Sequence, residues 1–142
     1  MLRVTLNPEL QAWAMGFPLT LLHAGVGLLI LAAGAAIYAL LTPHREIRLI
    51  REGNSAAAVS FGGVLVGLAI PLAASLAVSM SLIDVALWGV GTLVVQMAVF
   101  RLIDLMLRGL PARIAKGEVS AAALLVGAKI AAALILAAAV AG

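Results

Sequence analysis

The segment FPLTLLHAGVGLLILAAGAAIYALL, which runs from Phe17 to Leu41, contains no Asp, Glu, Lys or Arg. Because a helix rises about 1.5 Å per residue, a segment of this length can cross a hydrocarbon core about 30 Å thick. Three more segments share this character, and they are Ala56 to Ile83, Val85 to Phe100 and, with Lys129 as its one charge, Val119 to Gly142. The sequence therefore predicts an all-α integral membrane protein with four transmembrane helices.

The composition agrees with a membrane protein. Hydrophobic residues make up 65% of the chain and charged residues 11%, and the mean hydropathy is +1.22. These values lie far from those of a soluble domain. Because the four segments use most of the 142 residues, no separate extramembrane domain could form its own core, and we expect a single membrane domain over residues 1–142.

The two halves of the chain resemble each other at an offset of about 64 residues. The matched positions include Gly25 with Gly89, Gly27 with Gly91, Gly53 with Gly117, Ala57 with Ala121, and Gly63 with Gly127. This pattern favours two tandem helical hairpins. The first would span 17–80, with helices at about 17–41 and 56–80, and the second 81–142, with helices at about 82–107 and 119–141.

Basic residues gather in two loops. The first loop contains Arg45, Arg48 and Arg51, and the second contains Arg108, Arg113 and Lys116. The positive-inside rule puts both loops in the cytoplasm and both termini in the periplasm of a bacterial inner (plasma) membrane. Each loop also carries helix signals, so we expect a short interfacial helix from about Pro43 to Glu52 and a similar one between Pro111 and Gly117.

The partners expected from this charge pattern are lipids. The sequence pI is about 10.2, but the basic residues lie beside membrane segments, where anionic headgroups are the nearest counter-charge. No aromatic residues interleave the basic ones to stack on bases, so nucleic acid is not expected. Abundant Gly and Ala favour close helix packing, either within one chain or in a homo-oligomer.

Metal, redox and nucleophilic chemistry find little support in the sequence. The chain has no Cys, and its two His, His23 and His44, show no zinc spacing. No nucleophile–base pair, paired carboxylates or metal cluster is visible either. We therefore expect no cofactor, no metal and no enzymatic activity.

Lys129 and Gln96 are the main polar candidates inside the membrane. Each lies ten or eleven residues from the inner end of its predicted helix, which is about 15 Å deep and near the midplane. They are expected to hydrogen-bond across the second hairpin. No carboxylate is expected at that depth, because Asp104 lies near the inner end of its helix, where Arg101 is its expected partner. A lysine left charged would favour anions in a pore.

Three further features have mainly structural interpretations. His23 lies inside the first predicted helix, where a packing role is favoured over a proton relay. Pro71 lies inside the second, where it should kink the helix, with Ser75 compensating for the lost hydrogen bond. Ser81 and Asp84 form a capping-box pattern at the start of the third.

The region from Thr42 to Phe100 also carries motifs that resemble a known family. They are TPH at Thr42 to His44, G-x-x-x-G-x-x-I-P-L at Gly63 to Leu72, and D-x-x-x-W-G at Asp84 to Gly89 with Gln96 beyond it. The chain resembles the domain-of-unknown-function 350 family of small bacterial inner-membrane proteins, the YjfL-like group. This resemblance implies one or two copies of a membrane unit, no assigned reaction, and a link to envelope maintenance. Lys129 has no part in the motifs.

Two functions follow as expectations. The first is a non-enzymatic oligomeric component in envelope homeostasis, or one that recruits a cytoplasmic protein through the basic loops. The alternative is a small oligomeric channel or transporter in which Lys129 and Gln96 line the path and Pro71 shapes it. Four helices are too few to enclose much of a water-filled path, so transport would require an oligomer.

Overall fold

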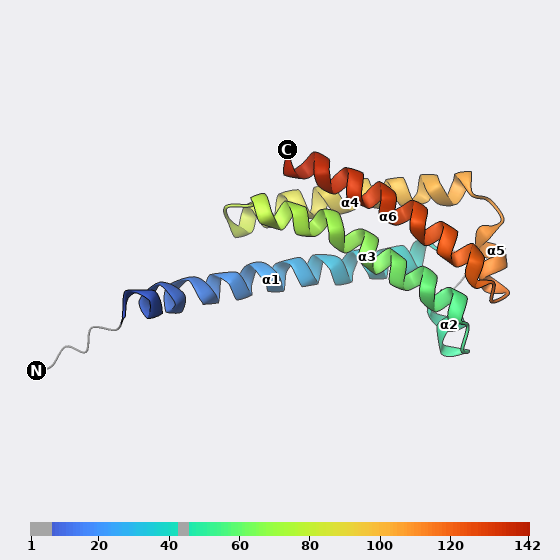
Figure 1. Ribbon diagram of the computed structural model, residues 1–142, viewed down its shortest axis with the longest axis horizontal. Helices are drawn as coiled ribbons and strands as arrows, with labels where there is room; N and C mark the ends of the chain where they lie inside the picture. Colours follow the sequence, from blue (N-terminus) through green and yellow to red (C-terminus); the bar gives the residue numbers. More distant parts are fainter. Residues whose placement is uncertain (1–6, 43–45) are drawn as a thin grey trace, which may run out of the picture.

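The computed structural model describes residues 7–42 and 46–142, and within these residues it contains helices and no strands (Figure 1). The helices are α1 (Pro8–Leu41), α2 (Glu46–Arg51), α3 (Ser55–Val78), α4 (Leu82–Met106), α5 (Leu110–Ala115) and α6 (Val119–Ala141). Four of them, α1, α3, α4 and α6, are long and apolar enough to span a membrane. The predicted all-α membrane fold is confirmed.

Local signals set where most helices begin. The Asn54 side chain accepts a hydrogen bond from the Ala57 backbone N–H at 2.9 Å and so caps α3. At α4, Ser81 Oγ accepts from the Asp84 N–H and Asp84 accepts from the Met80 N–H, both at 3.1 Å. The predicted cap at Ser81 is therefore confirmed, but the Asp84 carboxylate accepts from the N–H of Met80 and not from that of Ser81, as a standard capping box requires.

The first helix begins earlier than expected. Its predicted start was about residue 17, but α1 begins at Pro8, where the Asn7 side chain accepts from the Glu9 N–H and proline occupies the first turn. With 34 residues, α1 is about 51 Å long, which exceeds the thickness of a hydrocarbon core. Figure 1 shows its N-terminal part extending beyond the other helices.

Both short helices lie at the same end of the bundle, which we call the short-helix end (Figure 1). The element observed in the first loop is α2, and residues 43–45, which include His44 and Arg45 and the expected start at Pro43, lie outside the described residues. The expected element in the second loop is α5. Each short helix is followed by a glycine with φ +89°, Gly53 or Gly117, a backbone conformation that favours glycine. The tandem repeat itself stays a prediction.

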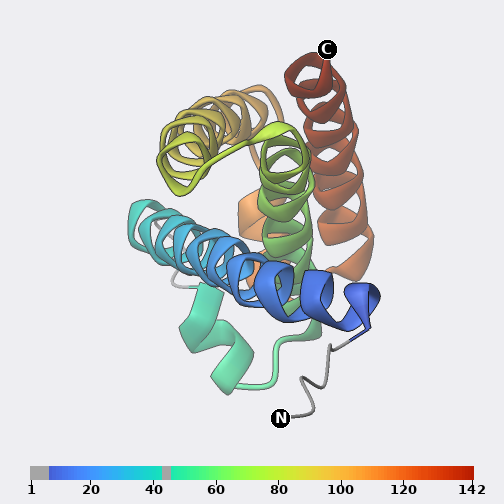
Figure 2. The same cartoon turned by 90° about the vertical axis from the view of Figure 1, so that its left-hand side faces the viewer.

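Helix α3 lies at the centre of the bundle. Seen from the end opposite the short helices, it is surrounded by α1, α4 and α6 (Figure 2), and it contacts all of them and both short helices. Alanines from α3 and α6 form a close contact at the short-helix end, in a core cluster that contains Ala56, Ala57, Leu110, Ile114, Ala121, Ala122 and Leu125. Small side chains let these two helices approach closely.

The glycines fall into two groups. A Cβ at Gly27, Gly34, Gly63, Gly67 or Gly89 would meet a side chain of a neighbouring helix, so these positions serve packing within the chain. Gly25, Gly62, Gly91 and Gly127 have open space around them. The second group and the many exposed Leu, Ile and Val side chains face away from the core, as expected for helices surrounded by lipid or by other copies.

Candidate functional site

Lys129 is the centre of a polar cluster inside the bundle. It projects from α6, is 1% exposed, and donates a hydrogen bond of 2.6 Å to the hydroxyl of Tyr38 on α1. Its Nζ also lies 4.7 Å from the centre of the Tyr38 ring and 5.1 Å from that of Phe100, distances at which an ammonium is attracted to aromatic faces. The lysine therefore has partners on two other helices.

The expectation that no carboxylate lies near Lys129 is wrong. Lys129 Nζ forms an ion pair with Asp104 on α4, at 2.8 Å from Oδ1. The geometry explains the error. A helical side chain leans toward the N-terminus of its helix, so Lys129 leans toward the short-helix end, while Asp104, on a helix of opposite direction, leans toward the bundle centre. The expected pair between Asp104 and Arg101 does not form.

The expected bond between Lys129 and Gln96 is also wrong. Gln96 is fully buried on α4, yet neither its amide nitrogen nor its oxygen has a hydrogen-bond partner among the described residues. The lysine side chain leans instead toward Asp104 and Tyr38. Gln96 therefore remains a buried polar group without a protein partner.

Glu46, in the first turn of α2, is a functional candidate that the sequence did not indicate. It is only 7% exposed, and its Oε1 accepts a hydrogen bond of 3.0 Å from Ser60 Oγ on α3. Its Oε2 is buried and has no hydrogen-bond partner among the described residues. Loss of water on burial raises the pKa of this carboxyl, while the bond from Ser60 lowers it by a smaller amount.

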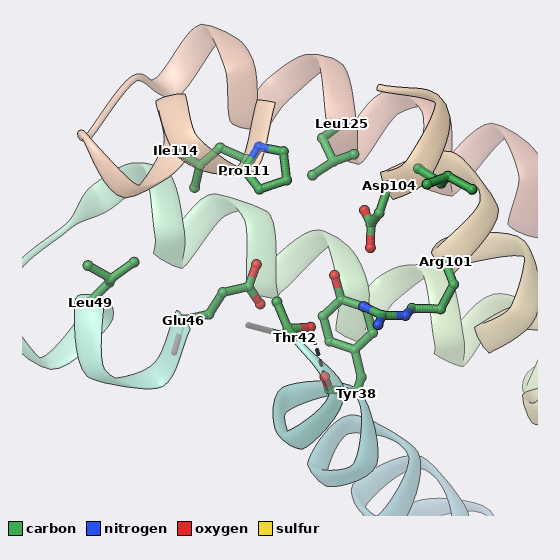
Figure 3. A pocket seen from close by; sticks show the side chains of 10 residues that line it. Tyr38, Thr42, Glu46, Leu49, Arg101, Asp104, Pro111, Ile114 and Leu125 are labelled. Carbon is green, nitrogen blue, oxygen red and sulfur yellow. Dashed lines mark hydrogen bonds between the residues drawn. The ribbon is translucent and has the colours of Figure 1, made fainter. Parts of the chain in front are cut away.

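Tyr38, Glu46 and Asp104 line a cavity of about 400 Å³ at the short-helix end (Figure 3). Its polar walls come from Tyr38, Thr42, Glu46, Arg101 and Asp104, and its apolar walls from Leu49, Leu105, Pro111, Ile114 and Leu125. Figure 3 shows the Glu46 carboxylate, the Tyr38 hydroxyl and the Asp104 carboxylate pointing toward one another across this space. The volume and the mixture of apolar walls with a few convergent polar groups are typical of small-molecule sites.

Arg101 is at the edge of the same cavity. It is exposed, unlike Glu46 and Lys129, and because Asp104 pairs with Lys129, the Arg101 guanidinium has no ion-pair partner among the described residues. The cavity wall thus combines Asp104, which is paired with Lys129, with two groups of opposite charge that form no ion pair with described residues. These two groups are Glu46 and Arg101.

Other predicted site residues lie apart from this cavity. The His23 ring bonds the Leu19 carbonyl of its own helix at 2.8 Å, as a packing histidine would. Pro71 is buried within α3, which continues through it, but Ser75 Oγ has no hydrogen-bond partner among the described residues and so does not compensate for it. In the described part of the chain, no group of three His, Cys, Asp or Glu could hold a metal ion.

The described basic residues of the two short-helix loops are exposed. Arg48 pairs with Glu52 at 2.8 Å, and Arg113 pairs with Glu118. Arg108 Nε donates to the Leu105 carbonyl at 3.1 Å. Arg51 and Lys116 are exposed as well, so the short-helix end carries exposed cationic groups.

The fold and the cavity together define a small multi-pass helical membrane protein with a buried ion pair and a polar cavity at one end. The chain belongs to the family described as Domain of Unknown Function (DUF350), which matches residues 12–140. The resemblance seen in the motifs is therefore confirmed.

Two curated relatives share part of the sequence. Over 64 residues, the chain is 42% identical to the UPF0719 inner membrane protein YjfL of Escherichia coli (strain K12), and to the protein of that name from Escherichia coli O157:H7. The match covers 45% of this chain and 48% of each relative, so it spans about half the length of the curated relatives. No solved structure matches the chain.

Proposed function

We propose that the protein is a non-enzymatic component of the bacterial inner membrane that binds a small ligand in the cavity at the short-helix end. The name of the Escherichia coli relative and the four apolar helices support the location. The basic residues of the two short-helix loops favour a cytoplasmic position for the short-helix end, with both termini in the periplasm.

The unpartnered oxygen of Glu46 carries this proposal. A buried carboxylate oxygen without a hydrogen-bond partner costs free energy, and such atoms are rare in folded proteins unless water or a ligand satisfies them. Here the oxygen belongs to a side chain that lines a cavity of about 400 Å³, large enough for a small organic group. A ligand that donates to this oxygen would remove the cost.

A binding role accounts for the cluster better than catalysis does. Lys129 is held by Asp104 and by the Tyr38 hydroxyl, so its ammonium is occupied rather than free to act as a nucleophile or base. The two hydroxyls that line the cavity are already bonded, because that of Tyr38 accepts from Lys129 and that of Thr42 donates to the Tyr38 carbonyl. The Ser60 hydroxyl donates to Glu46, but Ser60 does not line the cavity. A non-enzymatic role remains the simplest proposal for these contacts.

Native mass spectrometry with a matched pair of tryptophan variants tests the proposal. Leu105 and Leu102 lie on α4 and are each 55% exposed, but only Leu105 lines the cavity. We expect the wild-type protein to carry a bound small molecule after extraction from the membrane. The Leu105→Trp variant should lose this molecule, whereas the Leu102→Trp variant should retain it. Absence of any adduct from the wild-type protein, or equal retention by both variants, would contradict the proposal.

Recruitment of a cytoplasmic protein is a second candidate, supported by the exposed basic residues at the short-helix end. Arg48 and Arg113 are paired with glutamates, whereas Arg51, Arg108 and Lys116 form no ion pair with described residues. Cross-linking in cells, with these three residues changed to Gln, tests this role. Loss of a cross-linked protein, with the small-molecule adduct retained, would separate recruitment from ligand binding.

The transport alternative loses the feature that gave it an anion preference. That preference assumed a lone charged Lys129, but Asp104 neutralises the lysine and Glu46 adds another carboxylate beside the cavity. Flux measurements on liposomes that hold wild-type protein or Lys129→Met test the alternative directly. We expect no anion flux that depends on Lys129, and oligomeric state measured on the same samples would show whether a multi-subunit path exists.

A further inference from the structure

Two unpaired groups of opposite charge share the cavity wall. Glu46 offers a buried oxygen without a partner, and Arg101 offers a guanidinium without an ion-pair partner in the described residues. The remaining charged groups of the wall and the cluster, Asp104 and Lys129, neutralise each other at 2.8 Å. The cavity wall therefore offers a ligand one negatively charged hydrogen-bond acceptor and one positively charged hydrogen-bond donor.

Each free group limits the ligand chemistry. Glu46 Oε2 requires a hydrogen-bond donor, and a primary ammonium would also compensate the carboxylate charge, which would otherwise be costly at this burial. Arg101 presents a planar fork of N–H donors, which suits a phosphate or carboxylate. A ligand with only one of these charges would leave the other group unmatched.

The rest of the cavity suits a short hydrocarbon chain between the two charges. Half of the lining residues are apolar, and three of these, Leu49, Pro111 and Ile114, belong to the two short helices. These helices lie beside exposed basic residues at one end of the membrane-spanning bundle, where lipid headgroups are found. The site is thus placed where it can receive a molecule from the headgroup layer or from the aqueous phase beside it.

We propose that the cavity binds a zwitterion that carries a primary ammonium and a phosphate or carboxylate on a short linker, with the ammonium at Glu46 and the anion at Arg101. The ligand class rests on the proposed binding function. Two sources offer this chemistry, the headgroup of an amine-bearing phospholipid and a free amino-phosphate or amino acid.

Lipid titration of the purified full-length protein, followed by native mass spectrometry, tests the proposal. The lipid probes are short-chain phosphatidylethanolamine, phosphatidylcholine, whose quaternary ammonium cannot donate a hydrogen bond, and phosphatidylglycerol, which lacks the amine. We expect phosphatidylethanolamine to bind best. Glu46→Gln and Arg101→Gln should each weaken this binding roughly tenfold, the usual effect of losing one charge-assisted hydrogen bond.

A matched variant separates the cavity from general surface charge. Glu52→Gln changes the same residue type as Glu46→Gln at an exposed position near the short-helix end, and we expect it to leave binding unchanged. Gln at position 46 can still accept the hydrogen bond from Ser60, and Arg101 is exposed, so both cavity variants should fold. Far-ultraviolet circular dichroism checks this.

Soluble phosphoethanolamine and glycine identify the source. Displacement of the lipid by either compound indicates that a free zwitterion suffices, whereas no displacement indicates that the acyl chains contribute and the ligand is the lipid. Equal binding of all three lipids, or binding that neither cavity variant weakens, would overturn the zwitterion proposal. If Leu105→Trp still removed a bound molecule in that case, the proposed binding function would stand and only the ligand class would fail.

Discussion

Tyr38 and Lys129 are 91 residues apart in the chain, and the hydrogen bond of 2.6 Å between their side chains joins the first membrane-spanning helix to the last. Tyr38 also meets Phe100 edge to face, with ring centres 6.2 Å apart, so the same contact includes α4. The polar cluster therefore holds three helices together at the end of the bundle where the cavity lies. Changes in this cluster should be seen in the stability of the whole fold.

Removal of the lysine charge should destabilise the protein strongly. In Lys129→Met, Asp104 would lose its only ion-pair partner in the described residues while remaining mostly buried, and breaking such a pair typically costs about 3–5 kcal/mol. We expect a lower SDS concentration at the unfolding midpoint, measured by circular dichroism in mixed micelles. The double variant Lys129→Met with Asp104→Leu should recover most of the loss, because apolar residues often replace a buried pair without cost. Failure of the second change to recover stability would argue that the pair is not the reason for the loss.

Glu46 should make the stability of the ligand-free protein depend on pH. Burial raises the pKa of its carboxyl above the usual value of about 4.3, so the folded state binds this proton more tightly than the unfolded state. Stability should therefore fall as pH rises from about 4.3 through the raised pKa, and then stay level. The melting temperature of the wild-type protein minus that of Glu46→Gln, in delipidated samples, should decrease across this window. A difference that stays constant or increases would contradict the burial effect.

Neighbouring glycines on α3 should respond differently to alanine. A Cβ at Gly63 would collide with the side chain of Val126 on α6, whereas a Cβ at Gly62 would have nothing within 4 Å. Valine is stiff about its first side-chain torsion, so we expect Gly63→Ala to cost about 1–3 kcal/mol. Gly62→Ala should be neutral or stabilise by up to about 1 kcal/mol through helix propensity. Unfolding titrations of both variants decide the point, and equal effects would exclude the close α3–α6 contact.

Asn54 should stabilise the fold through its link to α5 as well as through its cap of α3. While its oxygen caps α3, its amide nitrogen donates to the carbonyls of Ile114 at 3.0 Å and Ala115 at 3.1 Å, at the end of α5. Asn54→Asp keeps the cap but replaces these donors with an acceptor, and we expect a loss of about 1–3 kcal/mol. Asn7→Asp, which affects only the cap of α1, is the control and should change stability little. A similar result for both variants would show that the link to α5 contributes nothing.

Replacement of Gln96 by an apolar residue should stabilise the protein. The side chain is fully buried, and its amide has no partner in the described part of the chain, so Gln96→Leu removes an unsatisfied polar group from the core. We expect a higher melting temperature, by circular dichroism, than for the wild-type protein. A marked loss of stability would instead indicate an ordered water or ligand bonded to the amide.

The helices could be predicted because their signals are local. Charge-free segments must satisfy their backbone hydrogen bonds internally within a bilayer, so length and composition are enough to predict a spanning helix. The caps at Asn54 and Ser81 also follow from short motifs. The early start of α1 had a local signal too, since Asn7 and Pro8 form an N-cap followed by proline, but Glu9 and Gln11 made this segment resemble an extramembrane one.

The candidate site was harder to predict because it depends on side-chain direction and on tertiary contacts. Depth along the helix axis describes the backbone of Lys129, whereas its ammonium lies nearer the short-helix end, beside Asp104. Glu46 belongs to a loop rich in arginine, and nothing in its neighbourhood in the sequence indicates that it will be buried and bonded to Ser60 on α3. The sequence thus indicated Lys129, the centre of the polar cluster, but not that Asp104 would pair with it or that Glu46 would line the cavity.

The position of Lys129 on the last helix has a consequence for biogenesis. The ribosome releases α1 and α4 before α6, so Tyr38 and Asp104 are already in the membrane when the lysine arrives. The residue that is most costly to insert therefore enters beside a waiting hydroxyl and counter-charge, and α6 depends on the earlier helices for its integration. In a nascent chain, the correct insertion of α1 and α4 would decide whether the final crossing is completed.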